Sequence, residues 1–465
     1  MTESELEQRS QAELRALVLA QAVQVAELTQ LVAQLRAENA ALRQKLGPGP
    51  KPPTTSRNSS QPPSRDQKAN RPAGGGRRGP PKGHAKFERA WVAEPAHIAV
   101  VKPEQCLACH TALAAVPGQV VQAHQLLELP ATPAEVIEVR EYAVVCPGCG
   151  QVARAEPPAG WERERQFGAR LEATVVYYRQ TQHLSYARTL AALRDLHGVT
   201  LSQGGIDQIM QRAGQAATQA AAGLATAIQQ SAVVYSDETP CRVDGHTWWE
   251  WVFRSATAVL HQIRFDRSVD VIRAVLGPAT VEVWVSDCYP AQLAAAARAH
   301  QLCLAHQLRN LQAVVDQTPA ALWPRAMQAV LRAAIHLHHQ RMALAPPHWD
   351  QQRQRLERVC TWLLRRRLVE PNARRLQQRY QKHRASLFVF LQRTDVEPTN
   401  NISERHLRPS VIHRKIIGCF RSEWGAHAYA ALASVIATAA LTGQNAFQAL
   451  LPLCGSPALP LPASR

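Results

Sequence analysis

Two short apolar runs in the middle of the chain each end in an aspartate. Residues 232–239 read Ala-Val-Val-Tyr-Ser-Asp-Glu-Thr, and residues 281–289 read Val-Glu-Val-Trp-Val-Ser-Asp-Cys-Tyr, which places Asp237 and Asp287 at equivalent points. Runs of this length, rich in β-branched and aromatic residues, are typical of buried strands. Two more strand-like runs, 247–253 and 258–265, and a helical stretch, 269–276, lie between them.

The order strand, strand, strand, helix, strand predicts a multidomain α/β protein with a ribonuclease-H-like catalytic core. In that layout the first and fourth strands lie side by side, so Asp237 and Asp287 would meet at neighbouring strand ends. A later helix would supply the third acid. We expect a helix at 290–299 after the fourth strand, and a catalytic domain over residues 229–443.

The candidate third acid, Glu404, stands in a basic sequence with Arg405, Arg408, Arg414 and Lys415. A solvated glutamate paired with Arg408 four positions on would look the same. The two upstream aspartates favour the other interpretation, in which Glu404 joins them as a ligand for Mg²⁺ or Mn²⁺. Two such ions, roughly 4 Å apart, stabilise the attacking and leaving oxygens of a phosphodiester. The basic side chains would hold phosphates.

The N-terminal segment carries a heptad pattern. Its two apolar series are Leu14, Gln21, Leu28, Leu35, Leu42 and Val18, Val25, Val32, Asn39, Leu46. Leucine at d, valine at a and one asparagine at a favour a parallel coiled coil over residues 5–46, and hence a homodimer. An amphipathic helix packed on its own chain is the alternative. Residues 47–88, rich in Pro, Gly, Ser and basic residues, predict a disordered basic linker, either touching phosphates or only spacing the domains.

Two CxxC units, Cys106 with Cys109 and Cys146 with Cys149, predict a zinc-binding module over residues 89–158. Two thiolates from each turn complete a tetrahedral shell, and four protein ligands leave no open position, so the Zn²⁺ would be structural. The sequence between the units, 119–145, alternates as short strands do. The alternative is that the two CxxC units are unrelated pairs of reduced cysteines.

Residues 160–228 predict a helical domain. Residues 184–196 are amphipathic, Gly198 suits a turn, and Ser202 can cap a second helix. The pair fits either a helix-turn-helix, whose second helix reads bases through Gln203, Asp207, Gln208 and Gln211, or a helical hairpin in the core.

An all-helical insertion is expected at about 311–395, and its arginines predict contact with flanking DNA phosphates; a solvated helical face is the alternative. Directly before it, Cys303 and His306 form a Cys-x-x-His unit, too few ligands for zinc. His306 either contacts a DNA phosphate or packs under the sheet. Residues 444–465 read as a C-terminal tail.

The charge balance favours a polyanionic partner. Lys and Arg number 53 against 36 acids, a formal charge of +17, which points to nucleic acid first and to an anionic membrane second. We expect no membrane association, because the most apolar run, 426–441, reads as a buried helix. An acidic N-terminus without a signal peptide and ten cysteines, two CxxC pairs among them, fit a reducing cytoplasm.

Together these motifs resemble the transposases of bacterial insertion-sequence family sixty-six, within the Asp-Asp-Glu superfamily. The likeness includes the coil, the linker, the CxxC units, and the string Asn-Asn-Ile-Ser-Glu-Arg-His-Leu-Arg-Pro at 400–409. The resemblance implies that Asp237, Asp287 and Glu404 are the catalytic triad and that the four cysteines bind zinc. It also implies accessory proteins from the same mobile element and a location in the bacterial cytoplasm, associated with the nucleoid.

The predicted function is therefore a DNA transposase that binds terminal inverted repeats and catalyses Mg²⁺-dependent strand cleavage and transfer into target DNA. The main alternative is a catalytically inactive, transposase-derived DNA-binding protein. A stand-alone nuclease of the same fold and a zinc-stapled coiled-coil adaptor are further alternatives.

Overall fold

The structure is a computed structural model that describes residues 11–46, 53–59, 66, 84, 89–129, 133–157, 162 and 165–455. The chain divides into two compact units, Met1–Asp66 with Ala217–Ala446 and Gln67–Ala216 with Phe447–Arg465. The predicted boundary between the helical and catalytic domains, at 228/229, thus falls earlier, inside helix α5 (Gln203–Gln229).

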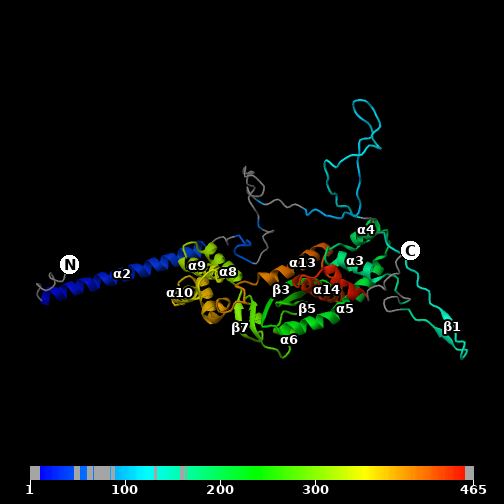
Figure 1. The fold of residues 1–465 in the computed structure, drawn as a ribbon. Coiled ribbons are helices and arrows are strands. Elements are labelled where there is room, and N and C mark those ends of the chain that lie inside the picture. Colours follow the sequence, from blue (N-terminus) through cyan, green and yellow to red (C-terminus); the bar gives the residue numbers. More distant parts are fainter. Residues whose placement is uncertain are drawn as a thin grey trace. The chain divides into compact units, whose positions relative to one another are not determined.

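The first unit is built on a five-stranded sheet in the order β5-β4-β3-β6-β7 (Figure 1). Its strands are β3 (Val233–Val243), β4 (His246–Arg254), β5 (Val259–Arg264), β6 (Val281–Ser286) and β7 (Ala297–Leu302). The first three are antiparallel, and β3, β6 and β7 are parallel. The first and fourth strands are neighbours, as predicted, and Tyr235 pairs with Val285.

The helix predicted at 290–299 is wrong beyond its first turn. Helix α7 (Pro290–Leu293) stops early, and Ala297–Leu302 forms β7 on the outer edge of β6. The Ala-rich sequence favours a helix locally. Strand pairing prevails because it satisfies the backbone groups along that edge of β6.

Strand residues are buried in hydrophobic clusters on both faces of the sheet. On one face Trp251, Phe253 and Trp284 pack with α6 (Val269–Leu276) and the C-terminal part of α5. The opposite face carries α13 (Asn401–Ile417) and α14 (Glu423–Leu441). By length and composition α14 is apolar enough to cross a membrane. Here it packs on β5, where the His261 N–H donates to Ser434 Oγ over 2.7 Å.

The insertion is helical, as predicted. It consists of α8 (Leu304–Gln317), α9 (Leu322–His339), α10 (Pro346–Leu364), α11 (Pro371–Lys382), the short η2 (Arg384–Ser386) and α12 (Val389–Gln392). Its buried Met327, Tyr380 and Phe390 belong to the same core as Tyr235 and Val285 of the sheet. The insertion is therefore packed onto the catalytic sheet.

The second unit contains the predicted helix pair. Its helices are α3 (Ala169–Gln180), α4 (Tyr186–His197) and the start of α5. Gly198 turns the chain with φ 67°, and Ser202 Oγ accepts the Gly205 N–H. Of the residues expected to face bases, Asp207 is only partly exposed and accepts the Tyr186 hydroxyl, while the remaining ones are exposed: Gln203, Gln208 and Gln211.

Part of the predicted tail is structured. After α15 (Ala446–Leu450), η3 (Leu451–Cys454) packs on α3. The Phe447 and Tyr177 rings meet edge to face, 6.0 Å apart.

The predicted coiled-coil segment is one helix, α2 (Gln11–Leu46). Four residues of the heptad seam, Val25, Leu28, Val32 and Leu35, are between 45% and 62% exposed in the single chain. Exposed apolar side chains at a and d positions are what a partner helix would cover. Residues 5–10 and most of the predicted linker lie outside the described residues, and the dimer stays a prediction.

Candidate active site

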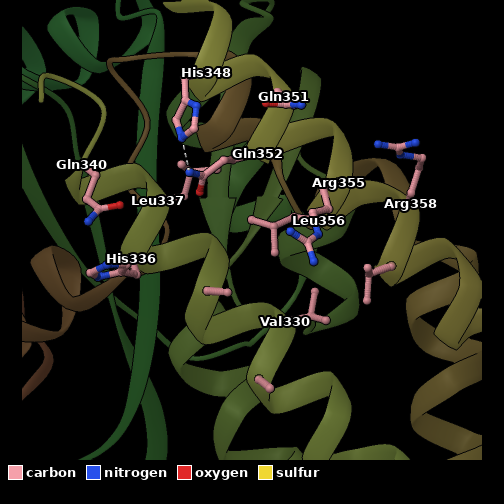
Figure 2. Close-up of a pocket in the computed structure, with 13 residues that line it drawn as sticks. Val330, His336, Leu337, Gln340, His348, Gln351, Gln352, Arg355, Leu356 and Arg358 are labelled. Atoms are coloured by element: carbon pink, nitrogen blue, oxygen red, sulfur yellow. Dashed lines mark hydrogen bonds between the residues drawn. The ribbon is translucent and has the colours of Figure 1, made fainter. Parts of the chain in front are cut away.

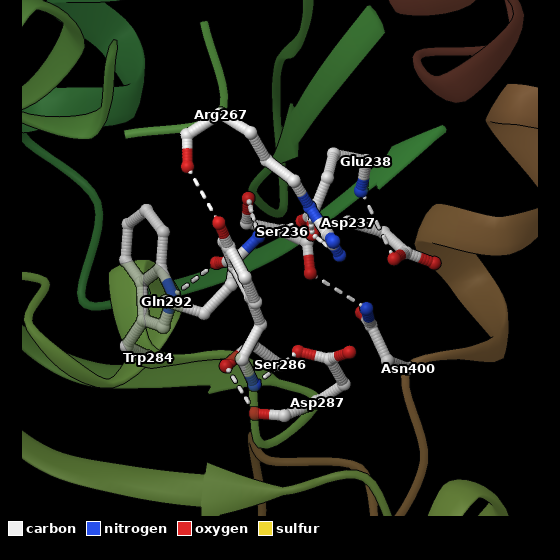
Figure 3. A network of polar contacts seen from close by, with 10 residues as sticks. Ser236, Asp237, Glu238, Arg267, Trp284, Ser286, Asp287, Gln292 and Asn400 are labelled. Carbon is white, nitrogen blue, oxygen red and sulfur yellow. Dashed lines mark hydrogen bonds and ion pairs between the residues drawn. The ribbon is translucent and has the colours of Figure 1, made fainter. Parts of the chain in front are cut away.

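Asp287 directly follows the end of β6, as predicted, whereas Asp237 lies inside β3 and pairs with Val252 of β4 (Figure 3). The strand end predicted at Asp237 is wrong, because pairing with β4 carries β3 on to Val243. Each lies two residues beyond the paired Tyr235 and Val285. The Glu238 N–H donates to Asp237 Oδ1 over 3.0 Å, and the Tyr289 N–H donates to Asp287 Oδ1 over 2.8 Å. The strand register therefore sets both carboxylates at one level of the sheet.

Burial raises the pKa of Asp237 well above its usual range, and the charges of Glu238, Asp287 and Glu404 raise it further. Each of these carboxylates is therefore close enough to act on Asp237 electrostatically. Negative groups that repel each other in a partly desolvated site favour either a proton or a cation. The charges of Asp287 and Glu404 thus act on Asp237, although the three residues are far apart in the sequence.

Glu404 lies in the first turn of α13, and its side chain is 35% exposed. Its Oε1 accepts a hydrogen bond from Arg309 Nη2 at 3.2 Å and lies 3.7 Å from His306 Nε2. Burial, followed by the charge of Arg309, lowers the pKa of His306. Two residues of α8 thus engage the third acid.

Oxygen-only carboxylate donors that repel one another suit a hard divalent cation such as Mg²⁺. Over the described part of the chain, however, no group of three or more His, Cys, Asp or Glu side chains is close enough to hold a metal ion. Asp237, Asp287 and Glu404 are therefore neighbours without forming a closed ligand set, and Glu404 bonds Arg309 instead.

A second buried acid, Glu238, was not singled out from the sequence. Its carboxylate accepts hydrogen bonds from Arg267 Nη2 and Gln292 Nε2, both over 2.6 Å. The Arg267 guanidinium lies 4.3 Å from the Trp249 ring centroid and 3.7 Å from that of Tyr289. The acid beside Asp237 was visible in the sequence, but its distant partners were not.

Comparison with protein families matches residues 164–428 to the transposase IS66 family. The chain belongs to this family. The match covers more than half of the 465 residues and includes all three acids. The resemblance predicted from the motifs is confirmed, and it makes the chain a member of a family of DNA-processing enzymes. No curated protein matches the chain.

The transposase carries several basic residues on α13, next to the acids. Arg405, Arg408 and Lys415 are exposed, which leaves them accessible to a phosphate. Arg414, also predicted to contact DNA, is buried, and its Nη1 lies 3.3 Å from Glu250 Oε2. Its guanidinium faces the sheet and, in this structure, is not available to a phosphate.

The helical insertion of the transposase has a groove between α9 and α10 that is lined by both apolar and polar side chains (Figure 2). His336, His348, Arg355 and Arg358 are among its lining residues. Seven of the insertion's predicted DNA-contacting arginines are exposed: Arg355, Arg358, Arg365, Arg366, Arg367, Arg374 and Arg375. Arg353 is partly buried and pairs with Asp350 and Glu357.

The two CxxC units form the same backbone turn. The His110 N–H donates to the Cys106 carbonyl, and the Gly150 N–H donates to the Cys146 carbonyl, each over 2.9 Å. His110 and Gly150 both take a left-handed conformation, with φ of 58° and 73°. A turn of this kind brings two thiols of one CxxC unit to the same side, as a metal knuckle requires.

Hydrogen bonding lowers the pKa of one thiol in each unit. Thr111 is the cause at Cys109, and the backbone N–H groups of Gly148 and Cys149 are the cause at Cys146. The two turns do not meet, since the described residues contain no metal-holding group of three. In the described parts of the segment predicted as short strands, 119–129 and 133–145, the one strand is β1 (Ala143–Val145), which pairs with β2 (Val152–Arg154).

Proposed function

We propose that this IS66 family member is an active Asp-Asp-Glu transposase that binds the terminal inverted repeats of its element, cleaves DNA and transfers the strands to a target. The supporting observation is that Asp237 and Asp287 each lie two residues beyond a paired position of adjacent β3 and β6, and that the charges of Asp287 and Glu404 both raise the pKa of Asp237. The strand order β5-β4-β3-β6-β7 also supports the proposal, because it is the order expected of a ribonuclease-H-like catalytic core.

In this proposal Asp237 and Asp287 hold Mg²⁺ or Mn²⁺ together with Glu404. Bound there, the ions would supply the Lewis acidity that activates a water or a DNA 3′-hydroxyl and stabilises the leaving oxygen. For this role, Glu404 must release the hydrogen bond that it accepts from Arg309 and bind the metal instead. Arg309 is then free to pair with a phosphate oxygen.

The DNA would lie against α13 and the insertion. Exposed Arg405, Arg408 and Lys415 would neutralise phosphates without reading sequence. His306 is uncharged at neutral pH because its pKa is lowered, so it would contribute a hydrogen bond. Zn²⁺ would join the Cys106–Cys109 and Cys146–Cys149 turns, which must approach each other to bind it.

Strand transfer tests this function. Pre-cut element ends, a target plasmid and Mg²⁺ are incubated with the full chain, with Asp287→Ala, and with the exposed-site control Asp266→Ala. The proposal expects joined products from wild type and the control, and a loss of about a thousandfold or more in Asp287→Ala, as for removal of a group that stabilises the transition state.

Two observations favour the alternative, an inactive DNA-binding relative: Glu404 is bonded to Arg309, and the described residues contain no group of three side chains that could hold a metal ion. If the wild type binds ends but is as inert as Asp287→Ala with both Mg²⁺ and Mn²⁺, the alternative holds. Equal cutting of DNA without element ends would indicate a general nuclease instead.

A further inference from the structure

Cys303 connects the start of the insertion to the strand that carries Asp287. It is buried directly before α8. Its N–H donates to the carbonyl of Ser286 over 2.7 Å, and Ser286 immediately precedes Asp287. Its Sγ accepts the backbone N–H of Asn400 over 3.1 Å.

Asn400 makes the matching connection to the strand that carries Asp237 (Figure 3). It is fully buried directly before α13. Its Nδ2 donates to the carbonyl of Ser236 over 2.7 Å, and Ser236 immediately precedes Asp237. Its own carbonyl accepts the Glu404 N–H over 3.2 Å, which starts the turn that carries the third acid.

These bonds form one continuous path from Ser286 through Cys303 and Asn400 to Ser236. We propose that Cys303 and Asn400 act as positioning residues, a bracket that holds the residues directly before both aspartates and the first turn of the Glu404 helix in one geometry. This role rests on the proposed transposase chemistry, which needs the three acids to converge.

The chemistry of the bracket fits positioning better than direct participation. Burial raises the pKa of the Cys303 thiol to about 11, so at neutral pH it is neither a thiolate ligand nor a nucleophile. The side-chain amide of Asn400 donates to the Ser236 carbonyl. Its backbone N–H donates to Cys303 Sγ, and its backbone carbonyl accepts the Glu404 N–H. Because a shift of about 1 Å at reacting groups can cost roughly a hundredfold in rate, loosening either bond should impair catalysis.

The test compares Cys303→Ala and Asn400→Ala with matched controls in the full chain. Cys360→Ala removes an equally buried thiol from α10, and Asn401→Ala removes the exposed neighbouring amide. Strand transfer is measured against Mg²⁺ concentration, beside end-DNA affinity and Tm. We expect each bracket variant to lose about tenfold or more in maximal rate and to need more Mg²⁺, with DNA affinity unchanged within about twofold.

Two further variants separate positioning from folding. Cys303→Ser keeps an acceptor for the Asn400 N–H and should recover most of the lost rate. The double variant Cys303→Ala/Asn400→Ala should lose less than the product of the single losses, because both act through one path. Wild-type rate and Mg²⁺ dependence in folded Asn400→Ala, or equal losses in Cys360→Ala, would overturn the bracket.

If wild type itself is inert in strand transfer, the proposed function fails, and Mn²⁺ binding then decides about the bracket. Binding to the zinc-loaded full chain is followed by the loss of the free-Mn²⁺ electron paramagnetic resonance signal. Weaker binding in Cys303→Ala and Asn400→Ala, but not in the controls, supports the bracket. Equal binding in all four variants, or none in wild type, rejects it.

Discussion

At Asp237, burial and three neighbouring carboxylates all favour the protonated form. A carboxyl group whose pKa is raised on folding binds its proton more tightly in the folded state. It therefore adds stability at acid pH, and this contribution is lost as pH rises through the raised pKa. Without metal, the ionised Asp237 should make the folded protein less stable near neutral pH than an uncharged isostere would.

Asp237→Asn should accordingly raise the Tm of the metal-free protein near neutral pH. A relief of about 1 kcal/mol corresponds to roughly 2–4 °C in a unit of this size. The difference from wild type should vanish at acid pH, where both side chains are neutral, and Mg²⁺ should stabilise only wild type. Scanning calorimetry in chelator and in Mg²⁺ measures this, with Asp266→Asn as the exposed control. A lower Tm in Asp237→Asn would contradict the assignment.

At the residue scale, the pattern of apolar residues located the strand end before Asp287. It did not show that Asp237 lies inside β3, because the continuation of β3 to Val243 depends on pairing with β4. Sequence reasoning also misplaced Arg414, which lies next to the exposed Lys415. The partner that buries Arg414 is Glu250, on a strand far away in the sequence. The helix sequence alone cannot show which of two adjacent basic residues faces the sheet.

A buried network of charged side chains helps to hold helix α13 on the sheet. Glu250 Oε2 lies 3.3 Å from Arg414 Nη1, and Glu250 Oε1 lies 3.1 Å from His261 Nδ1. Removing one partner of a buried pair leaves an uncompensated charge, which costs about 3–5 kcal/mol. Arg414→Ala should therefore lower the free energy of unfolding by about that amount in denaturant titrations.

Lys415→Ala is the matched comparison on the same helix turn. It should change stability by less than about 0.5 kcal/mol, yet reduce the salt dependence of DNA binding by about one unit of slope. Filter binding across a salt series measures the second effect. The opposite outcome, a stable Arg414→Ala with weakened DNA binding, would return Arg414 to the DNA surface.

The two cysteine turns predict a metal-linked element. We expect about one Zn²⁺ per chain, bound by four thiolates. Cys146→Ser should release most of it, whereas Cys419→Ser, at a partly buried single cysteine, should keep it. Elemental analysis measures the content, and chelation should increase proteolysis between residues 106 and 149. Equal zinc in both variants would show that the turns do not bind it.

Elements with strong local signals were predicted well, while elements set by distant partners were not. Ser202 and Gly198 marked the helix pair through capping and turn chemistry. The Ala-rich β7 carried a helical signal, and only the open edge of β6 made it a strand. Residues 119–142 alternate as strands do, but a strand also needs a neighbouring strand to pair with. No such pairing forms in the described residues of this segment, 119–129 and 133–142.

For the whole molecule, α2 determines the assembly that we predict. A monomer of 51.3 kDa should sediment as a dimer of twice that mass. Leu28→Asp places a charge in the heptad seam and should yield monomers, because a and d positions are buried between helices. Leu19→Asp, at an exposed position outside the seam, should stay dimeric. Dimers of unchanged mass in Leu28→Asp would locate the interface elsewhere.

A dimer would hold two DNA ends at once, and each protomer would need a complete set of acids. The central claim is thus that Asp237, Asp287 and Glu404 close around divalent metal ions. The most direct measurement is anomalous scattering from crystals of the zinc-loaded chain with Mn²⁺ and end DNA. We predict anomalous density bonded to Asp237 and Asp287, with Glu404 moved from Arg309 to the metal. The account is contradicted if crystals exposed to saturating Mn²⁺ show no anomalous density between these acids and Glu404 is still hydrogen-bonded to Arg309.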